Sequence, residues 1–120
     1  MSQFWKYSIF NTQFSIILAD LPCTGSGTWS RTPEQLFYFD PQKIREYATL
    51  QRKILSNVID QLEPGGHLLY ITCSVFKKEN EEQVDFMKEK FLLQEEKSEL
   101  IKGYDKKADT MFAALLRKPQ

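Results

Sequence analysis

A long amphipathic segment between two short apolar runs constrains the fold of this chain more than any other feature. From Ile44 to Leu62, apolar residues recur at steps of three and four, which predicts a helix with one buried stripe. Apolar runs at residues 16–19 and 68–72 flank this segment and are typical of buried strands. Parallel strands joined by a helix form a right-handed crossover, so we expect both strands to end at the same edge of one sheet.

Local signals mark both ends of the predicted helix. Asp40 can cap free amide groups, and Pro41 has the fixed φ that suits a first helical position. The sequence Glu63-Pro-Gly-Gly66 should end the helix and turn the chain. At one step of the apolar stripe, either Leu50 or Gln51 could face the core. The full stripe is Ile44, Tyr47, Leu50 or Gln51, Ile54, Leu55, Val58, Ile59 and Leu62.

A second helix and two further strands are expected after residue 74. Carboxylates at 79–82 suit the first turn of a helix, and we interpret this run as a solvated helix start. Residues 91–93 are expected to begin a strand, 95–107 are charged and loop-like, and 110–117 form a plausible last strand. This alternation predicts an α/β domain with a largely parallel sheet.

Aromatic residues are concentrated in two segments without a clean period. Residues 2–15 are interpreted as core or interface, with a short helix or turn. Residues 29–39 are expected to form a loop with one helical turn from Pro33, and the aromatic side chains of this loop should pack on another part of the molecule.

The composition is that of one ordered domain with no global charge signature. The chain has 120 residues, of which 42% are hydrophobic, and its 16 basic and 16 acidic residues give zero net charge. Nucleic-acid binding would therefore depend on a local patch or another domain. No apolar run approaches the roughly 18 residues that span a bilayer, and no secretory signal is evident, so we expect a soluble, cytoplasmic protein.

Two cysteines follow the two predicted strands. Cys23 and Cys73 should therefore face one cleft, and as reduced thiols they could be structural or could act in covalent catalysis. A cysteine peptidase or acyl transferase would need a base, but the one histidine, His67, begins its strand on the opposite edge. With one histidine and no CxxC, we predict no metal site.

Four motifs closely resemble those of the Sun-type (RsmB-type) RNA cytosine-5 methyltransferases. They are Asp20-Leu-Pro-Cys-Thr-Gly-Ser-Gly27, Pro64-Gly-Gly66, Thr72-Cys-Ser74 and Glu79-Asn-Glu-Glu82, and the resemblance runs from about Phe14 to the end. It implies a partial Rossmann-like fold that uses S-adenosylmethionine. Residues 1–120 would be a single domain, the C-terminal part of a catalytic domain. The family's glycine-rich cofactor loop is not found among the 19 residues before Asp20, so the cofactor site would be incomplete.

The resemblance also implies roles for individual residues. Cys73 would be the thiolate that attacks cytosine C6, and Cys23 the thiol that assists release. Asp20 would lie between cofactor and base, and Pro22 would line the cofactor site beside the bound base. Thr24 and Arg31 would contact RNA; for Arg31, a phosphate contact and a role in holding the loop both stay open. The substrate would be a cytosine in single-stranded RNA or one extruded from a helix.

Two alternative functions remain at this point, one catalytic and one non-catalytic. A DNA cytosine-5 methyltransferase would carry its nucleophile on the Pro-Cys loop, against which Thr72-Cys73-Ser74 argues. A non-catalytic binding or assembly module could keep the fold without the chemistry. The isolated chain is expected to be inactive, and its strand at 16–19, without its expected neighbours, would be an exposed edge through which a homodimer could form.

Overall fold

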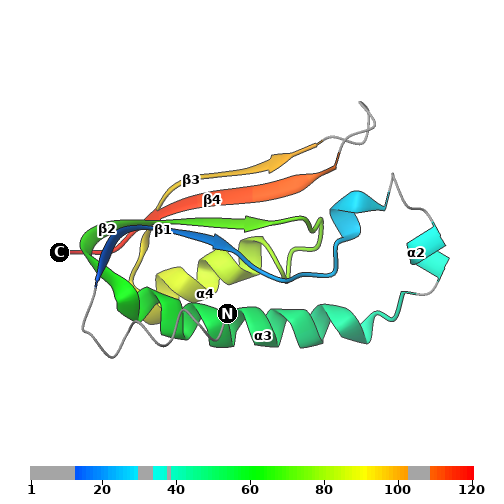
Figure 1. Ribbon diagram of the computed structural model, residues 1–120, viewed down its shortest axis with the longest axis horizontal. Coiled ribbons are helices and arrows are strands. Elements are labelled where there is room, and N and C mark those ends of the chain that lie inside the picture. The colour runs from blue at the N-terminus through cyan, green and yellow to red at the C-terminus, as the bar shows by residue number, and fades with distance from the viewer. Residues whose placement is uncertain (1–12, 30–33, 38, 103–108) are drawn as a thin grey trace.

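The structure, a computed structural model, describes residues 13–29, 34–37, 39–102 and 109–120. A four-stranded sheet in the order β1-β2-β4-β3 is covered on one side by the helices α3 and α4 (Figure 1). Its elements are β1 (Phe14–Asp20), the 3-10 helix η2 (Ser26–Thr28), α2 (Glu34–Phe37), α3 (Gln42–Val58), the 3-10 helix η3 (Ile59–Gln61), β2 (Leu62–Thr72), α4 (Glu81–Phe91), β3 (Gln94–Ile101) and β4 (Met111–Arg117).

The predicted crossover is present. β1 and β2 pair in parallel, with Ile17 opposite Leu68, and α3 connects them. β4 is antiparallel to both β2 and β3. The α/β class is therefore as predicted, and the sheet is mixed, with its parallel part confined to β1 and β2.

The core lies between the sheet and its two helices. Alternate residues of the strands face the helices and are buried, because a strand turns successive side chains to opposite faces. On the central strands these core residues are Leu68, Tyr70, Phe112, Ala114 and Leu116. They pack against Ile54, Leu55 and Val58 of α3 and against Val84 and Met87 of α4.

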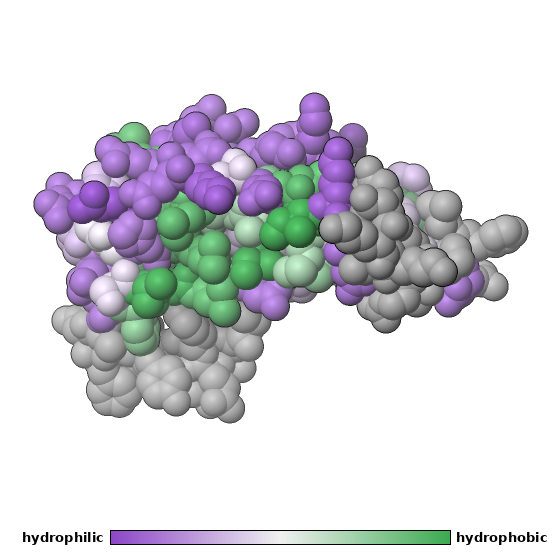
Figure 2. Space-filling model, turned by 90° about the horizontal axis from the view of Figure 1, so that it is seen from above, coloured by the Kyte–Doolittle hydropathy of each residue, from purple (hydrophilic) through white to green (hydrophobic). Residues whose placement is uncertain are grey.

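The other face of the sheet is open. Ile16 and Leu18 of β1 are 67% and 64% exposed, although both are large apolar residues. The pairing register places Leu69 beside Leu18 and Leu115 beside Leu69, so an apolar surface continues across three strands. Figure 2 views the molecule from this side and shows hydrophobic residues gathered in its middle.

The capping by Asp40 at the start of α3 is confirmed, whereas Pro41, expected at the first helical position, is the N-cap residue before Gln42. Asp40 accepts a hydrogen bond through Oδ1 from the amide of Gln42 (3.0 Å), and its carbonyl accepts one from the amide of Lys43 (2.9 Å). The ambiguous step of the stripe is resolved in favour of the polar residue, since Gln51 is fully buried and Leu50 is 41% exposed.

The structure corrects two strand boundaries. β2 begins at Leu62, so the segment Glu63-Pro-Gly-Gly66 lies within a strand and not in a turn before it. β3 occupies Gln94–Ile101, where a charged loop was expected. β3 is an edge strand held by the backbone pairing with β4, and seven of its eight residues are exposed, so no apolar alternation marks it in the sequence.

The loop before α3 contains the predicted helical turn as α2. Trp29, Phe39 and Phe76 form a small aromatic cluster, with ring centroids 4.7 Å apart for Trp29 and Phe39 and 5.8 Å for the stacked pair Phe39 and Phe76. The expectation that aromatics of this loop pack is confirmed for these residues. The expectations for residues 2–12 and for Arg31 fall outside the described residues. Within the described residues, no helix is long and apolar enough to cross a membrane.

Candidate active site

The carboxyl ends of β1 and β2 bring the two cysteine-bearing loops together. The amide of Leu21 donates to the carbonyl of Ile71 (3.3 Å), which extends the strand pairing by one step. Beyond it, the amide of Gly27 donates to the carbonyl of Cys73 (2.8 Å). Both cysteines are free thiols and half-buried. The expectation that the two strands end at one edge is confirmed.

Gly27 lies at the tightest contact of this edge. A Cβ built there would be 1.9 Å from the carbonyl oxygen of Thr110 and 2.9 Å from that of Cys73. The carbonyl of Gly27 in turn accepts a hydrogen bond from the amide of Thr110 (2.8 Å). Only glycine allows this approach, which joins the Cys23 loop, the Cys73 loop and the entry to β4.

Both thiols are held in their protonated form at neutral pH. Burial raises the pKa of Cys23, against opposing effects from backbone hydrogen bonds at Gly25 and Cys73, and the charge of Glu79 adds a smaller contribution that raises it. Burial also raises the pKa of Cys73, with added contributions from the carboxylates of Asp20 and Asp109. Each thiol would need a change in its surroundings to become a thiolate.

Two carboxylates belong to the surroundings of Cys73. Asp20 is exposed at the end of β1, and its charge acts on Cys73. Its place between cofactor and base stays a prediction. Asp109 precedes β4, and its charge acts on Cys73. Phe112 of β4 packs in the core and is 2% exposed.

The other two predicted site residues of the first loop, Pro22 and Thr24, both form hydrogen bonds with the rest of the chain. Pro22 is exposed, and its carbonyl accepts a hydrogen bond from Gln51 (2.9 Å). Thr24 directs both its hydroxyl and its amide to the carboxyl group of Glu79. Its hydroxyl proton is thus already used within the chain, and an RNA contact by Thr24 stays a prediction.

The sequence interpretation was wrong for Glu79. Glu81 and Glu82 are exposed, as expected of a solvated helix start, but Glu79 and Asn80 are buried. Asn80 accepts from the hydroxyl of Thr72 (2.5 Å) and donates to the carbonyl of Ser74 (2.7 Å). The sequence offered one signal for this polar cluster, namely Gln51 on an otherwise apolar stripe.

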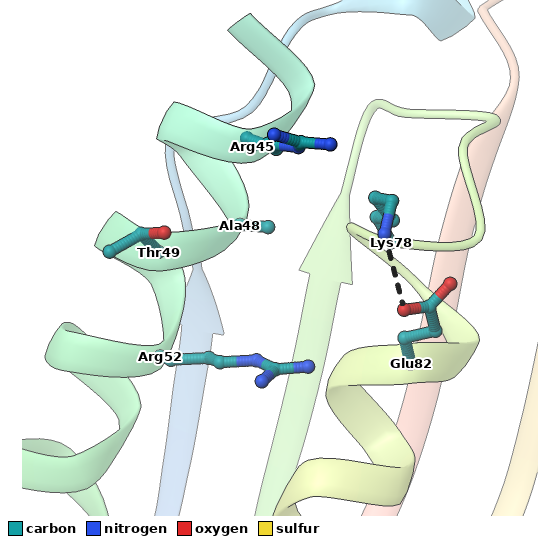
Figure 3. Close-up of a pocket in the computed structure, with 6 residues that line it drawn as sticks. All are labelled: Arg45, Ala48, Thr49, Arg52, Lys78 and Glu82. Atoms are coloured by element: carbon teal, nitrogen blue, oxygen red, sulfur yellow. Dashed lines mark ion pairs between the residues drawn. The ribbon is translucent and has the colours of Figure 1, made fainter. Parts of the chain in front are cut away.

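A separate shallow pocket of about 160 Å³ lies between α3 and the start of α4 (Figure 3). Its lining includes the cations Arg45, Arg52 and Lys78 together with Glu82. The guanidinium of Arg52 donates to Gln83 (2.9 Å) and lies over the ring of Phe86 (4.8 Å to the centroid). Arg52 is therefore engaged in helix packing. Within the described residues, these side chains form no hydrogen bond or ion pair with the two cysteine-bearing loops.

Solved structures share this fold. NSun6 from Pyrococcus horikoshii, solved with SFG, superposes with a TM-score of 0.83 and 27% identity, over 96% of this chain and 33% of that chain. A methyltransferase homolog protein from Pyrococcus horikoshii gives a TM-score of 0.76 and 25% identity, over 92% of this chain and 41% of its own. The fold is thus that of part of a methyltransferase domain.

The sequence comparisons give the family. The model of the family described as 16S rRNA methyltransferase RsmB/F matches residues 1–117, and the chain belongs to this family. Ribosomal RNA small subunit methyltransferase F of Shewanella amazonensis is 38% identical over 93 residues, which are 75% of this chain and 20% of that protein. Methyltransferase B of Cronobacter sakazakii is 45% identical over 73 residues, or 61% of this chain and 17% of the relative. The match thus spans about a fifth of these relatives' length, and the resemblance predicted from the four motifs is confirmed.

Proposed function

We propose that this chain is the C-terminal part of the catalytic domain of a cytoplasmic RNA cytosine-5 methyltransferase that acts on ribosomal RNA. The observation that carries the proposal is the pair of half-buried free thiols on two loops that are hydrogen-bonded to each other. Methylation at C5 needs one group that adds to C6 and another that assists release, and two thiols at one sheet edge can divide these tasks. The family match supports RNA as the substrate.

The proposed steps use three side chains of this chain. The thiolate of Cys73 adds to C6 of the cytosine and moves electron density to C5, while Asp20 hydrogen-bonds or protonates N3 as charge builds there. S-adenosylmethionine, when bound, supplies the methyl group. Cys23, as its thiolate, then removes the proton from C5 while the bond between C6 and the sulfur of Cys73 breaks. A proton given to N3 returns to Asp20, and the thiolate of Cys73 is restored.

The cofactor would be held by this chain on one side only. Asp20 and Pro22 are exposed at the carboxyl end of β1, which forms an edge of the described sheet. These residues fit one wall of a site, with a carboxylate that can accept hydrogen bonds from the cofactor. We infer that the isolated chain binds S-adenosylmethionine weakly and transfers no methyl group. Calorimetry tests this, and micromolar binding by the 120 residues alone would contradict it.

The division of roles between the thiols can be tested in a chimera. Residues 14–117 would replace the matching segment of ribosomal RNA small subunit methyltransferase F, and methyl transfer to ribosomal RNA would be measured. Cys73→Ala should abolish transfer, whereas Cys23→Ala should trap a covalent RNA adduct visible on a denaturing gel. If Cys73→Ala traps the adduct, the two roles are interchanged, and two fully active single variants would contradict the proposal.

We also propose that the isolated chain forms a homodimer through the β1 edge and the open face beside it. Among the described residues β1 pairs with β2 alone, so the other side of its backbone is open to a second chain. Ile16 and Leu18 add exposed apolar side chains at this position. Sedimentation at increasing concentration measures the association, and a monomer at all concentrations would contradict it. A dimer without methyl transfer would equally suit a non-catalytic assembly module.

A further inference from the structure

The carboxyl group of Glu79 lies between the two cysteine-bearing loops. Glu79 has no exposed surface, and its side chain accepts four hydrogen bonds. Its Oε1 accepts from the hydroxyls of Thr24 (2.6 Å) and Ser74 (2.5 Å). Its Oε2 accepts from the amide of Thr24 (2.9 Å) and from Nε2 of Gln51 (3.1 Å). Thr24 directly follows Cys23, and Ser74 directly follows Cys73.

No cation in the part of the chain that the structure describes balances this carboxyl group. Within the described residues, no lysine, arginine or histidine forms an ion pair with Glu79. A buried acidic group is costly unless hydrogen bonds replace its lost hydration, so the four donors are what hold it there. Three of the four come from Thr24 and Ser74, and the fourth comes from Gln51, which also donates to the carbonyl of Pro22 (2.9 Å).

The backbone of Glu79 is fixed independently of these loops. Its carbonyl accepts a hydrogen bond from the hydroxyl of Tyr70, a buried residue of β2. Its amide donates to the carbonyl of Phe76 (3.1 Å). The carboxyl group is therefore presented to the loops from a rigid base, whereas Glu81 and Glu82 next to it point to solvent.

We propose that Glu79 is a positioning residue that clamps the Cys23 loop to the Cys73 loop and so sets the two thiols relative to each other. The benefit to methyl transfer rests on the proposed function, but the clamp itself is a property of the folded chain. Glu79 touches no reacting atom in this role. Burial raises the pKa of Cys23, and the negative charge of Glu79 adds to this in the same direction.

The geometry separates the clamp from the charge. Oε1 faces two hydroxyls, which can accept as well as donate, whereas Oε2 faces two N–H groups, which can only donate. A glutamine can therefore keep its oxygen toward the N–H groups and turn its Nε2 toward the hydroxyl of Thr24. The hydroxyl of Ser74 already accepts from the amide of Phe76 (3.1 Å) and from the hydroxyl of Ser26 (3.3 Å), so this contact is weakened. Glu79→Gln should keep the Thr24 contacts of the clamp without its charge, and Glu79→Ala should lose both.

The experiment measures each cysteine separately in the 120-residue chain. Alkylation by iodoacetamide is followed by mass spectrometry as a function of pH, and exchange of the Thr24 amide is followed by NMR. Glu79→Ala should accelerate alkylation of both cysteines severalfold and remove the protection of the Thr24 amide. Glu79→Gln should retain that protection and move the alkylation profile of Cys23 to lower pH. Glu82→Ala and Glu82→Gln, at an exposed carboxylate in the first turn of α4, are the matched controls and should change neither readout.

The outcomes separate the clamp from the proposed function. If Glu79→Ala leaves both thiol profiles and the Thr24 amide as in the wild type, the clamp is overturned. If Glu79→Ala does not fold, Glu79→Gln decides, since loss of Thr24 protection in this variant also overturns the proposal. The measurements need neither RNA nor cofactor, so failure of the chimera to show the proposed cysteine roles leaves them unaffected.

Discussion

Burial and, to a lesser degree, the charges around Cys73 raise the pKa of its thiol. Asp20 and Asp109 both raise the pKa of this thiol, because a nearby negative charge disfavours a thiolate. To donate a proton or a hydrogen bond to N3 in the proposed step, Asp20 must enter that step as the neutral acid. In that form it does not oppose the thiolate of Cys73, so the charge that disfavours the thiolate is absent when Cys73 attacks.

Asp20→Asn should therefore lower the pKa of Cys73. The substitution removes a negative charge and keeps the size of the side chain, so a larger fraction of the thiol is ionised at any pH below the pKa. Iodoacetamide reacts with the thiolate, so the alkylation profile of Cys73 should move to lower pH. Mass spectrometry of the modified peptides measures this shift. Asp60→Asn, at an exposed carboxylate beyond α3 that does not act on Cys73, is the control.

A single methyl group at Gly27 should disrupt the contact between the loops. The nearest atoms to a Cβ at Gly27 are backbone carbonyl oxygens, which cannot move without shifting β4 or the Cys73 loop. Gly27→Ala should lower the free energy of unfolding by about 1–3 kcal/mol, as overpacking does in a dense core. Denaturant unfolding measures the loss, and an alanine tolerated without loss of stability would show that the loops can separate freely.

Gly25→Ala is the control variant for Gly27→Ala. Gly25 has a φ of +74°, which an alanine adopts with strain, but the nearest atom to its Cβ is the hydroxyl of Thr28 at 3.9 Å. This variant reports backbone strain alone. It should leave the alkylation rate of Cys73 unchanged, whereas Gly27→Ala should raise it.

Among the elements, β2 and α4 are joined by a hydrogen bond from Tyr70 to the backbone just before α4. Burial raises the pKa of Tyr70, so its hydroxyl remains a donor, and it donates to the carbonyl of Glu79 (2.5 Å). Tyr70→Phe leaves that buried carbonyl without this partner and should lower the free energy of unfolding by about 1–2 kcal/mol. Tyr47→Phe is the control, since the described residues give its hydroxyl no hydrogen bond. Equal losses in the two variants, measured by denaturant unfolding, would contradict this account.

The elements also show which parts of the fold the sequence could predict. The periodic stripe of α3 and the apolar run of β2 are local patterns, and both predicted elements are present. β3 carries no such pattern, because it is held by pairing with β4 and both of its faces meet solvent. Its existence depends on a neighbour that lies elsewhere in the chain.

Strand direction made one part of the candidate site predictable, whereas contacts between distant residues were not predictable. The meeting of the loops that carry Cys23 and Cys73 follows from strand direction alone, so the sequence was sufficient to predict it. The burial of Glu79 depends on Thr24 and Ser74 reaching it from two loops, and no local pattern contains that information. A helix start rich in carboxylates looks the same whether its first one is solvated or enclosed.

At the scale of the whole molecule, the sheet has one covered face and one open face. The open face includes a shallow groove of about 250 Å³ lined by Leu69, Ala113 and Leu115 together with Lys97 and Glu99. Apolar surfaces of this kind on a soluble domain mark places where another surface packs. The relatives are about five times longer than the matched region, so in an enzyme of that length further chain is available to cover the face.

In the isolated chain, the open face should drive the proposed self-association. Leu18 is 64% exposed on the edge strand beside Ile16, so a lysine there places a charge where a second chain would pack and leaves the core untouched. Leu18→Lys should shift the sedimentation profile toward monomer, with little change in thermal stability when this is compared at low concentration. Leu50→Lys is the matched control, because Leu50 is 41% exposed on α3, on the other side of the sheet. If both lysine variants associate as the wild type does, the contact lies elsewhere, and the β1 edge is not the interface.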